Sequence, residues 1–262
     1  MFPTIASLLA SVLYCLSAFL IFKQLGNATQ NRWMPLAPAL LAMVFHAITL
    51  NQLIYQPSGL NLGFFNAFSL ISWLVSIQIL LCCIFRRIES LGIAVFPMSG
   101  LAIIFTIVNL TEPQIISGDN AIQGHIMVSV VAYSLIMLGA IQAGLLAYQD
   151  YSIRTHNPGG FIRFLPPMHD METLLFQFLS FGFICLSAAL MTGFIFLEDI
   201  FAQHLVHKTV LSIVAWFILA ILLLGRFQFG WRGKTAIRWS ISAFAFLMLA
   251  YFGSKLVLEI IL

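Results

Sequence analysis

The sequence has very little charge. Only 8% of its 262 residues are Asp, Glu, Lys or Arg, whereas 61% are hydrophobic. A soluble globular domain carries about a quarter charged residues, so this composition excludes an ordinary water-soluble fold and predicts an integral membrane protein. The formal net charge of +3 gives no reason to expect a nucleic-acid partner.

The sequence also lacks the short motifs by which many enzymes are identified. Its four cysteines form no C-x-x-C or C-x-x-C-H pattern, so covalent haem attachment, zinc binding and disulfides have no support. No Walker loop, dinucleotide fingerprint or H-E-x-x-H pattern is present, and no nucleophile–base pair stands out. We therefore expect that the chain is not an enzyme.

Acidic residues are missing from the apolar runs. The nine Asp and Glu residues fall in the polar connections or near the end of a run. The membrane interior therefore offers no carboxylate cage for Mg²⁺ or Ca²⁺ and no obvious proton relay. Histidines, aromatic rings and hydroxyls are the polar groups that remain at depth.

Long apolar runs are abundant. A helix needs about 20 apolar residues to cross the hydrocarbon core, and the runs are too long and too continuous for the alternating strands of a barrel. The predicted spans are residues 4–22, 35–56, 63–85, 91–110, 122–148, 173–197, 208–225 and 237–260. We predict an all-α polytopic helix bundle with eight transmembrane helices, forming a single domain over residues 1–262.

The cations define an orientation for these spans. Ten of the twelve Lys and Arg residues fall in the odd-numbered loops, and only Lys208 and Lys255 lie on the other side. By the positive-inside rule, both termini face outward and the odd loops are cytoplasmic. Because the first cation follows the first apolar run, we expect a retained first span rather than a cleaved signal peptide. The segment around Trp231 and Trp239 is interpreted as an interfacial anchor with its cations toward anionic lipid.

One apolar run carries a polar face. His125, Ser129 and Tyr133 are spaced by four residues in the fifth span, so they share one side of a helix. An ionisable residue inside a span is a functional candidate by default. Imidazole is a good ligand for iron, whereas the hydroxyl residues are also common in plain helix packing.

Other polar side chains form a second group of candidates. His46 is expected near the membrane midplane, and His204 and His207 in the loop before the seventh span. In the third span, Asn66 and Trp73 share a polar face, for which helix packing is the alternative explanation. Histidine, aromatics and hydroxyls together suit a large, flat, mostly apolar ligand with an imidazole-binding metal, which describes haem.

Several blocks resemble the cytochrome c assembly (CcsA-like) family of haem-handling membrane proteins. "HIMVSVVAYSLI" (residues 125–136) resembles the family's outer-histidine helix, and "LPPMHDMETLLFQFLSFGF" (165–183) is similar to the small YpjD/HemX-like branch. Further blocks follow in the family's order: residues 58–73, 208–216, 230–236 and 251–258. The resemblance covers nearly the whole chain. It implies haem transport or presentation at the outer face of the bacterial inner membrane, together with other cytochrome assembly or membrane proteins.

Three positions depart from the family pattern. The tryptophan-rich WWD segment is replaced by "DIFAQHLVH" before Lys208, and the family's histidine after Trp216 falls on Leu224. The second outer histidine is expected after "YFGSKLVLEII", where the sequence reaches Leu262. The resemblance therefore implies a haem-binding relative with a changed ligand set rather than a full haem exporter and ligase.

The resemblance assigns roles to the candidates. His125 matches the first outer ligand of non-covalently bound haem b, with Ser129 and Tyr133 lining the pocket beneath it. We rank His46 ahead of His204 and His207 as the second ligand. Lys208 and Lys255 are the candidate counter-charges for the haem propionates, and Asn66, Trp73 and Trp216 are candidate lining residues. Two alternatives stay open: a transporter of another amphipathic small molecule, and a non-catalytic accessory or regulatory subunit.

Overall fold

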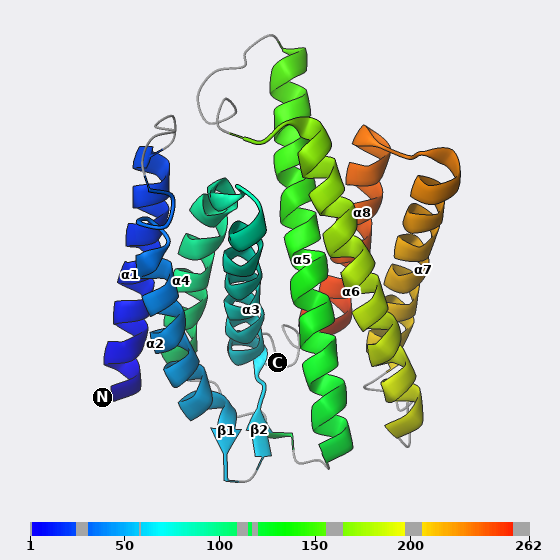
Figure 1. Cartoon of the computed structure of the whole chain (residues 1–262). Coiled ribbons are helices and arrows are strands. Elements are labelled where there is room, and N and C mark those ends of the chain that lie inside the picture. The colour runs from blue at the N-terminus through cyan, green and yellow to red at the C-terminus, as the bar shows by residue number, and fades with distance from the viewer. Residues whose placement is uncertain are drawn as a thin grey trace. The chain divides into compact units, whose positions relative to one another are not determined.

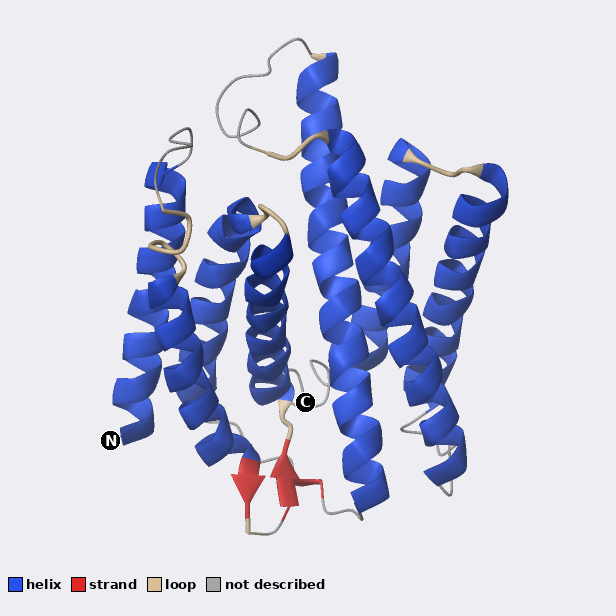
Figure 2. Ribbon diagram, viewed as in Figure 1, coloured by secondary structure: helices blue, strands red, loops and turns tan. Residues whose placement is uncertain are grey.

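The computed structural model describes residues 2–24, 31–57, 59–108, 115–116, 120–155, 165–196 and 206–253. Within these residues, eight helices are long and apolar enough to cross a membrane, which confirms the predicted all-α polytopic fold (Figures 1 and 2). The helices are α1 (Phe2–Gln24), α2 (Ala37–Ile54), α3 (Phe64–Phe85), α4 (Gly92–Val108), α5 (Asn120–Arg154), α6 (Met168–Phe196), α7 (Val206–Phe229) and α8 (Gly233–Met248). The chain is a multi-pass membrane protein.

A clear boundary difference within the described residues is at α5, whereas the predicted end of the last span, at residue 260, lies outside them. The apolar run of α5 was expected to end at residue 148, but the helix continues to Arg154. The Nε–H group of Arg154 donates to the Asp150 carboxylate one turn back, with both carboxylate oxygens at 2.9 Å, and such pairs four residues apart support a helix. The amide of Gln149 also donates to the Pro166 carbonyl, at 3.2 Å. These polar contacts extend the helix beyond its apolar part.

A small three-stranded sheet was not predicted. Strand β1 (Tyr55–Gln56) pairs antiparallel with β2 (Gly59–Asn61), which pairs antiparallel with β3 (Ile115–Ile116). Gly59 has a φ of 141°, a conformation that glycine adopts readily and other residues rarely do. The sheet ties the α2–α3 connection to the segment that follows α4.

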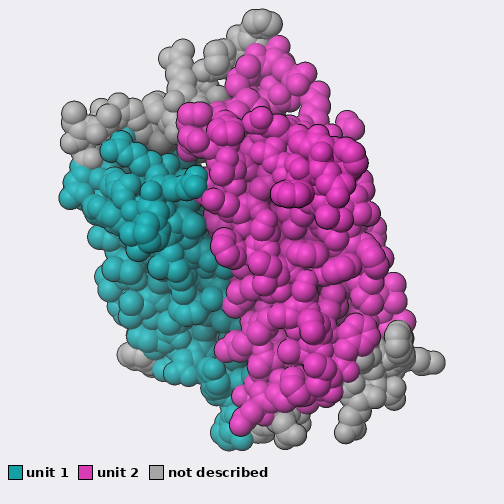
Figure 3. Space-filling model, turned by 45° about the vertical axis from the view of Figure 1, so that its right-hand side comes forward, with its two compact units in different colours: residues 1–117 teal, residues 118–262 magenta. Residues whose placement is uncertain are grey.

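The chain divides into two compact units, a subdivision that the sequence pattern did not indicate. Unit 1 is residues 1–117 and unit 2 is residues 118–262 (Figure 3). In each unit, four helices form a closed ring: neighbours in sequence pack together, and the first helix also packs against the last. Two further short turns complete the fold, a 3₁₀ turn at Glu89–Leu91 before α4 and a π-helical turn at Leu249–Gly253 after α8.

Close helix contacts in unit 2 depend on glycine. A Cβ on Gly182 of α6 would come within 2.7 Å of the Ile136 side chain of α5, and a Cβ on Gly139 of α5 would come within 2.7 Å of Leu179. The absent side chains allow α5 and α6 to approach closely along their length. This packing places the beginning of α5 beside the end of α6.

Candidate functional site

His125 lies on the second turn of α5 and is half-buried. Its Nδ1 is 3.1 Å from the Thr192 hydroxyl of α6. That hydroxyl donates its own proton to a backbone carbonyl of α6, with Ala188 O at 2.9 Å and Ala189 O at 3.0 Å. When the hydroxyl proton is used in this way, the Thr192 oxygen is left to accept from His125, and Nδ1 then carries the ring proton while Nε2 keeps a lone pair. This is the imidazole tautomer that is able to bind a metal through Nε2.

The two other members of the predicted face differ from each other. The Ser129 hydroxyl donates to the His125 carbonyl at 2.8 Å, so its proton is used within α5. Tyr133 instead reaches across the unit: its hydroxyl forms a hydrogen bond with Ser212 of α7, and its ring meets the edge of the Tyr251 ring at 5.9 Å. Tyr133 therefore links α5 to α7 and to the π turn after α8, whereas the Ser129 hydrogen bond stays within α5.

Lys208 belongs to the same aromatic group. Its ammonium nitrogen lies 6.0 Å from the centroid of the Tyr251 ring, a distance at which a cation is attracted to the ring face. His207 precedes it on the first turn of α7 and is exposed. We call this part of unit 2, where α5 and α7 begin and α6 ends, the histidine end.

The helix α7 gives a depth scale for unit 2. Lys208 and Arg226 are 18 residues apart, about 27 Å along a helix, which matches a hydrocarbon core of about 30 Å. Ser212 is then about 6 Å inside the boundary that Lys208 marks, and Tyr133 shares that depth. His125 precedes Tyr133 by two turns, about 12 Å. On this scale we expect His125 at headgroup depth, with the tyrosines beneath it.

His46 has a different environment, in unit 1. It is completely buried in the middle of α2, and both ring nitrogens have partners: Nδ1 lies 3.3 Å from the Tyr14 hydroxyl and Nε2 lies 2.8 Å from the Ser69 hydroxyl. A metal bond at either nitrogen would require the loss of one of these hydrogen bonds. His46 lies near the middle of α2, where its hydrogen bonds join helices.

The hydrogen bonds of His46 continue through the other helices of unit 1. The Tyr14 hydroxyl also forms a hydrogen bond with Ser76 of α3, and the Ser76 hydroxyl lies 2.8 Å from the Ser99 hydroxyl of α4. We call His46, Tyr14, Ser69, Ser76 and Ser99 the unit 1 network. It connects all four helices of the unit near their midpoints.

Three further candidates use their polar atoms in packing. The amide of Asn66 donates to the Asn61 carbonyl at 3.2 Å, and the indole of Trp73 donates to the Met43 carbonyl at 3.0 Å. The Trp216 indole donates to the Ser187 hydroxyl at 2.8 Å and stacks on Phe183 at 5.2 Å. These contacts bind helices within each unit.

Comparisons with known proteins find relatives over nearly the whole chain. The family model described as "Cytochrome C assembly protein" matches residues 33–262. The chain belongs to the cytochrome c assembly protein family. It is 31% identical to the inner membrane protein YpjD of Escherichia coli K12 over 97% of this chain and 98% of that protein. An uncharacterized 28.8 kDa protein of Azospirillum brasilense is 32% identical over 53% of this chain and 52% of its own length. No solved structure matches.

Within this family member, the structure groups the predicted residues by unit. His125, Ser129, Tyr133, Trp216, His207 and Lys208 are in unit 2, whereas His46, Asn66 and Trp73 are in unit 1. His204 and Lys255 lie outside the described residues. Among the residues that the structure describes, no three His, Cys, Asp or Glu side chains gather in a group that could hold a metal ion. A site built on one or two histidines is the remaining option there.

Sequence reasoning missed the partners that define these environments. Thr192, Ser212 and Tyr251 contact the predicted face of α5, and Tyr14 contacts His46. Each comes from a helix that is distant in sequence, and each is an ordinary residue within an apolar run. The one available signal was a polar side chain at a position that lipid would not favour.

Proposed function

We propose that this chain binds haem b non-covalently at the histidine end of unit 2 and handles haem for cytochrome c assembly. In this proposal the protein lies in the bacterial inner membrane with both termini outside, acts with other assembly proteins and catalyses no reaction itself. Membership of the cytochrome c assembly family and the similarity to a protein named as an inner membrane protein support the setting.

The observation that carries the proposal is the hydrogen bond between His125 and Thr192. Metal-binding histidines almost always donate their second ring N–H to an oxygen acceptor, which fixes the tautomer and the ring orientation. The Thr192 hydroxyl provides that acceptor at 3.1 Å. The donor set at His125 therefore fits an iron ligand, and the iron of a bound haem would accept the Nε2 lone pair.

The residues beneath His125 suit the rest of such a ligand. The rings of Tyr133 and Tyr251 are mostly apolar and meet at an interplanar angle of 62°, a contact that fixes them relative to each other. Lys208, beside Tyr251, is the described cation best placed to pair with a propionate. We retain Lys255 as a second candidate for that role from the sequence alone.

The second ligand is reassigned in this proposal. Both nitrogens of His46 already have hydrogen-bond partners, which makes it a poor ligand without rearrangement. His207 shares the histidine end with His125 and has an exposed side chain. We therefore place His207 ahead of His46, with His204 as the alternative from the sequence.

The test is an absorption spectrum of the detergent-purified protein with haem. The native chain should show a Soret band, and His125→Ala should remove or shift it while the protein still inserts in the membrane. His169→Ala is the matched control, because His169 lies at the opposite end of unit 2, where it accepts a hydrogen bond from Arg232. A native protein without a Soret band would favour a transporter of another amphipathic molecule or an accessory subunit.

Two further variants examine the ligand set. Loss of His207 should convert a low-spin spectrum to high-spin, and added imidazole should restore the low-spin form. Thr192→Val keeps the shape of the side chain but removes the acceptor for Nδ1. It should weaken haem retention by roughly 10- to 100-fold, as is typical for such supporting partners. Unchanged spectra in the His125, His207 and Thr192 variants would refute the assignment.

A further inference from the structure

The end of unit 2 opposite the histidine end carries several cations, and two of them are already neutralised or packed. Arg232 donates to the Glu172 carboxylate at 2.9 Å. Arg226 donates to the Trp231 carbonyl at 3.2 Å, and its guanidinium carbon lies 4.6 Å from the centroid of the Phe176 ring. We call this part of the unit the basic end. Its turn between α7 and α8 is fixed by these contacts.

Lys234 and Arg238 differ from those two arginines. Both are exposed on the first two turns of α8. Neither has a hydrogen bond or an ion pair with another residue that the structure describes. Because they are four residues apart, they share one helix face. This face therefore presents two neighbouring positive charges.

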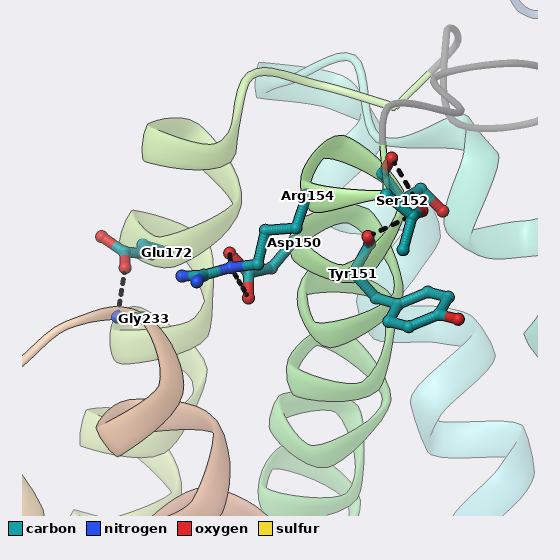
Figure 4. Close-up of polar contacts among 7 residues, drawn as sticks. Asp150, Tyr151, Ser152, Arg154, Glu172 and Gly233 are labelled. Carbon is teal, nitrogen blue, oxygen red and sulfur yellow. Dashed lines mark hydrogen bonds and ion pairs between the residues drawn. The ribbon is translucent and has the colours of Figure 1, made fainter.

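The position of these charges is electrostatically unfavourable within the protein. Like charges four residues apart repel, and cations near a helix N-terminus oppose the positive end of the helix dipole. The helix α8 contains no Asp or Glu. The nearby Glu172 is already used: its carboxylate accepts from Arg232 and, at 2.7 Å, from the Gly233 amide (Figure 4). An external anion would relieve the repulsion.

The same helix face continues as an apolar stripe. Beyond Arg238, the exposed positions are Ile241, Ser242, Ala245 and, in the π turn, Leu249, so the side that carries the cations becomes mostly apolar toward the other end of α8. Arg238 and Leu249 are 11 residues apart, about 16 Å along a helix. One leaflet of a hydrocarbon core of about 30 Å has a similar depth.

Two tryptophans mark the headgroup level beside the cations. The ring centroids of Trp231 and Trp239 lie 5.5 Å apart, and tryptophan is enriched where membrane meets water. Along α8, the cations and the aromatic rings thus come first and the apolar stripe follows. A phospholipid has the same order, with a charged headgroup followed by an apolar chain.

We propose that this face of α8 holds one anionic phospholipid. Its phosphate lies between Lys234 and Arg238, and an acyl chain follows Ile241, Ala245 and Leu249. The partner is an anionic lipid rather than a soluble anion, because the apolar stripe adds a chain-binding surface to the charges. This lipid site does not depend on haem binding at the other end of the unit.

Native mass spectrometry of the detergent-purified full chain tests the proposal. Phosphatidylglycerol and phosphatidylcholine with the same acyl chains are added in parallel. The native chain should retain one phosphatidylglycerol more tightly than phosphatidylcholine. The double variant Lys234→Gln, Arg238→Gln should bind phosphatidylglycerol roughly 30-fold more weakly, because each of the two basic residues near an anionic lipid contributes about 1 kcal/mol.

A charge-matched control separates a site from general attraction. Lys23→Gln, Arg87→Gln removes the same charge from exposed positions of unit 1 and should leave the retained lipid in place. Exchanging the cations, as Lys234→Arg, Arg238→Lys, should also preserve retention. Equal losses in the α8 and control variants would overturn the proposal. So would full displacement of the lipid by inorganic phosphate, which would indicate a soluble anion.

Discussion

The two units place their polar groups at different depths. In unit 1, the unit 1 network lies near the middle of the four helices, and His46 has partners at both ring nitrogens. In unit 2, the ionisable side chains with contacts between helices lie at the two ends, His125 with Thr192 at one and Glu172 with Arg232 at the other, and the Trp216–Ser187 hydrogen bond lies between them. Between them lies an apolar core that includes Ile136 and Leu219.

This difference separates a structural histidine from a candidate ligand. A buried polar group is stable when its hydrogen bonds are satisfied, and His46 meets that condition within its own unit. The Nδ1 of His125 lies against the Thr192 hydroxyl, which orients the ring, and Nε2 is the nitrogen that we propose for another partner. If His125 is the ligand as we propose, hydrogen-bond saturation indicates ligand function better than depth in the membrane.

The largest effect that would test this comparison is expected at His46. His46→Ala removes a fully buried ring and leaves the Tyr14 and Ser69 hydroxyls without one partner each. It should lower the free energy of unfolding by about 2–5 kcal/mol, measured by denaturation in mixed micelles. The Soret band of the haem-loaded protein should remain. Loss of the band at unchanged stability would instead identify His46 as a ligand. The histidine of unit 1 would then no longer differ in role from that of unit 2.

An intermediate effect is expected at the basic end of unit 2. Glu172→Gln weakens the partner of Arg232 and of the Gly233 amide, and only 7% of the Glu172 side chain is exposed. Breaking such a pair should cost about 1–3 kcal/mol, since the Arg232 side chain remains half-exposed to solvent. Asp150→Asn is the control, because its pair with Arg154 (Figure 4) is exposed and is expected to contribute at most about 0.5 kcal/mol. Equal losses of stability in the Glu172 and Asp150 variants would contradict the view that the Glu172–Arg232 pair contributes more than the exposed Asp150–Arg154 pair.

The smallest effect is expected at Ser129, within the predicted face itself. Its hydroxyl donates to the His125 carbonyl, and such bonds within one helix add little stability. Ser129→Ala should change the unfolding free energy by about 0.5 kcal/mol or less and leave the haem spectrum as it was. A clear spectral shift on this change would show that Ser129 acts in the pocket directly.

Much of the fold was predictable from the sequence, because each membrane span needs a long apolar run. All eight spans were found, and their limits differ mainly where polar contacts extend a helix, as at Asp150 and Arg154 of α5. The strands β1 and β3 were not predictable, since two residues carry no detectable alternation. They form because the ends of unit 1 helices bring distant segments together.

The candidate site was predictable in part. The spacing of His125, Ser129 and Tyr133 placed them on one helix face, but their different uses depend on residues far along the chain. Thr192 is 67 positions from His125, and its place beside the imidazole follows from the close packing of α5 on α6. For His46, the decisive partner is Tyr14, 32 positions away. No local pattern distinguishes a saturated histidine from an available one.

The length of α5 has a mechanical consequence. Its apolar run from 122 to 148 measures about 40 Å as a helix, whereas the stretch of α7 between Lys208 and Arg226 measures about 27 Å. Two helices of one packed unit thus suit bilayers of different thickness, and neither can tilt independently of the other. A thicker membrane would immerse the first turns of α5 and draw His125 into hydrocarbon. A thinner one would leave it among the headgroups, so the lipid composition itself tunes the environment of this histidine.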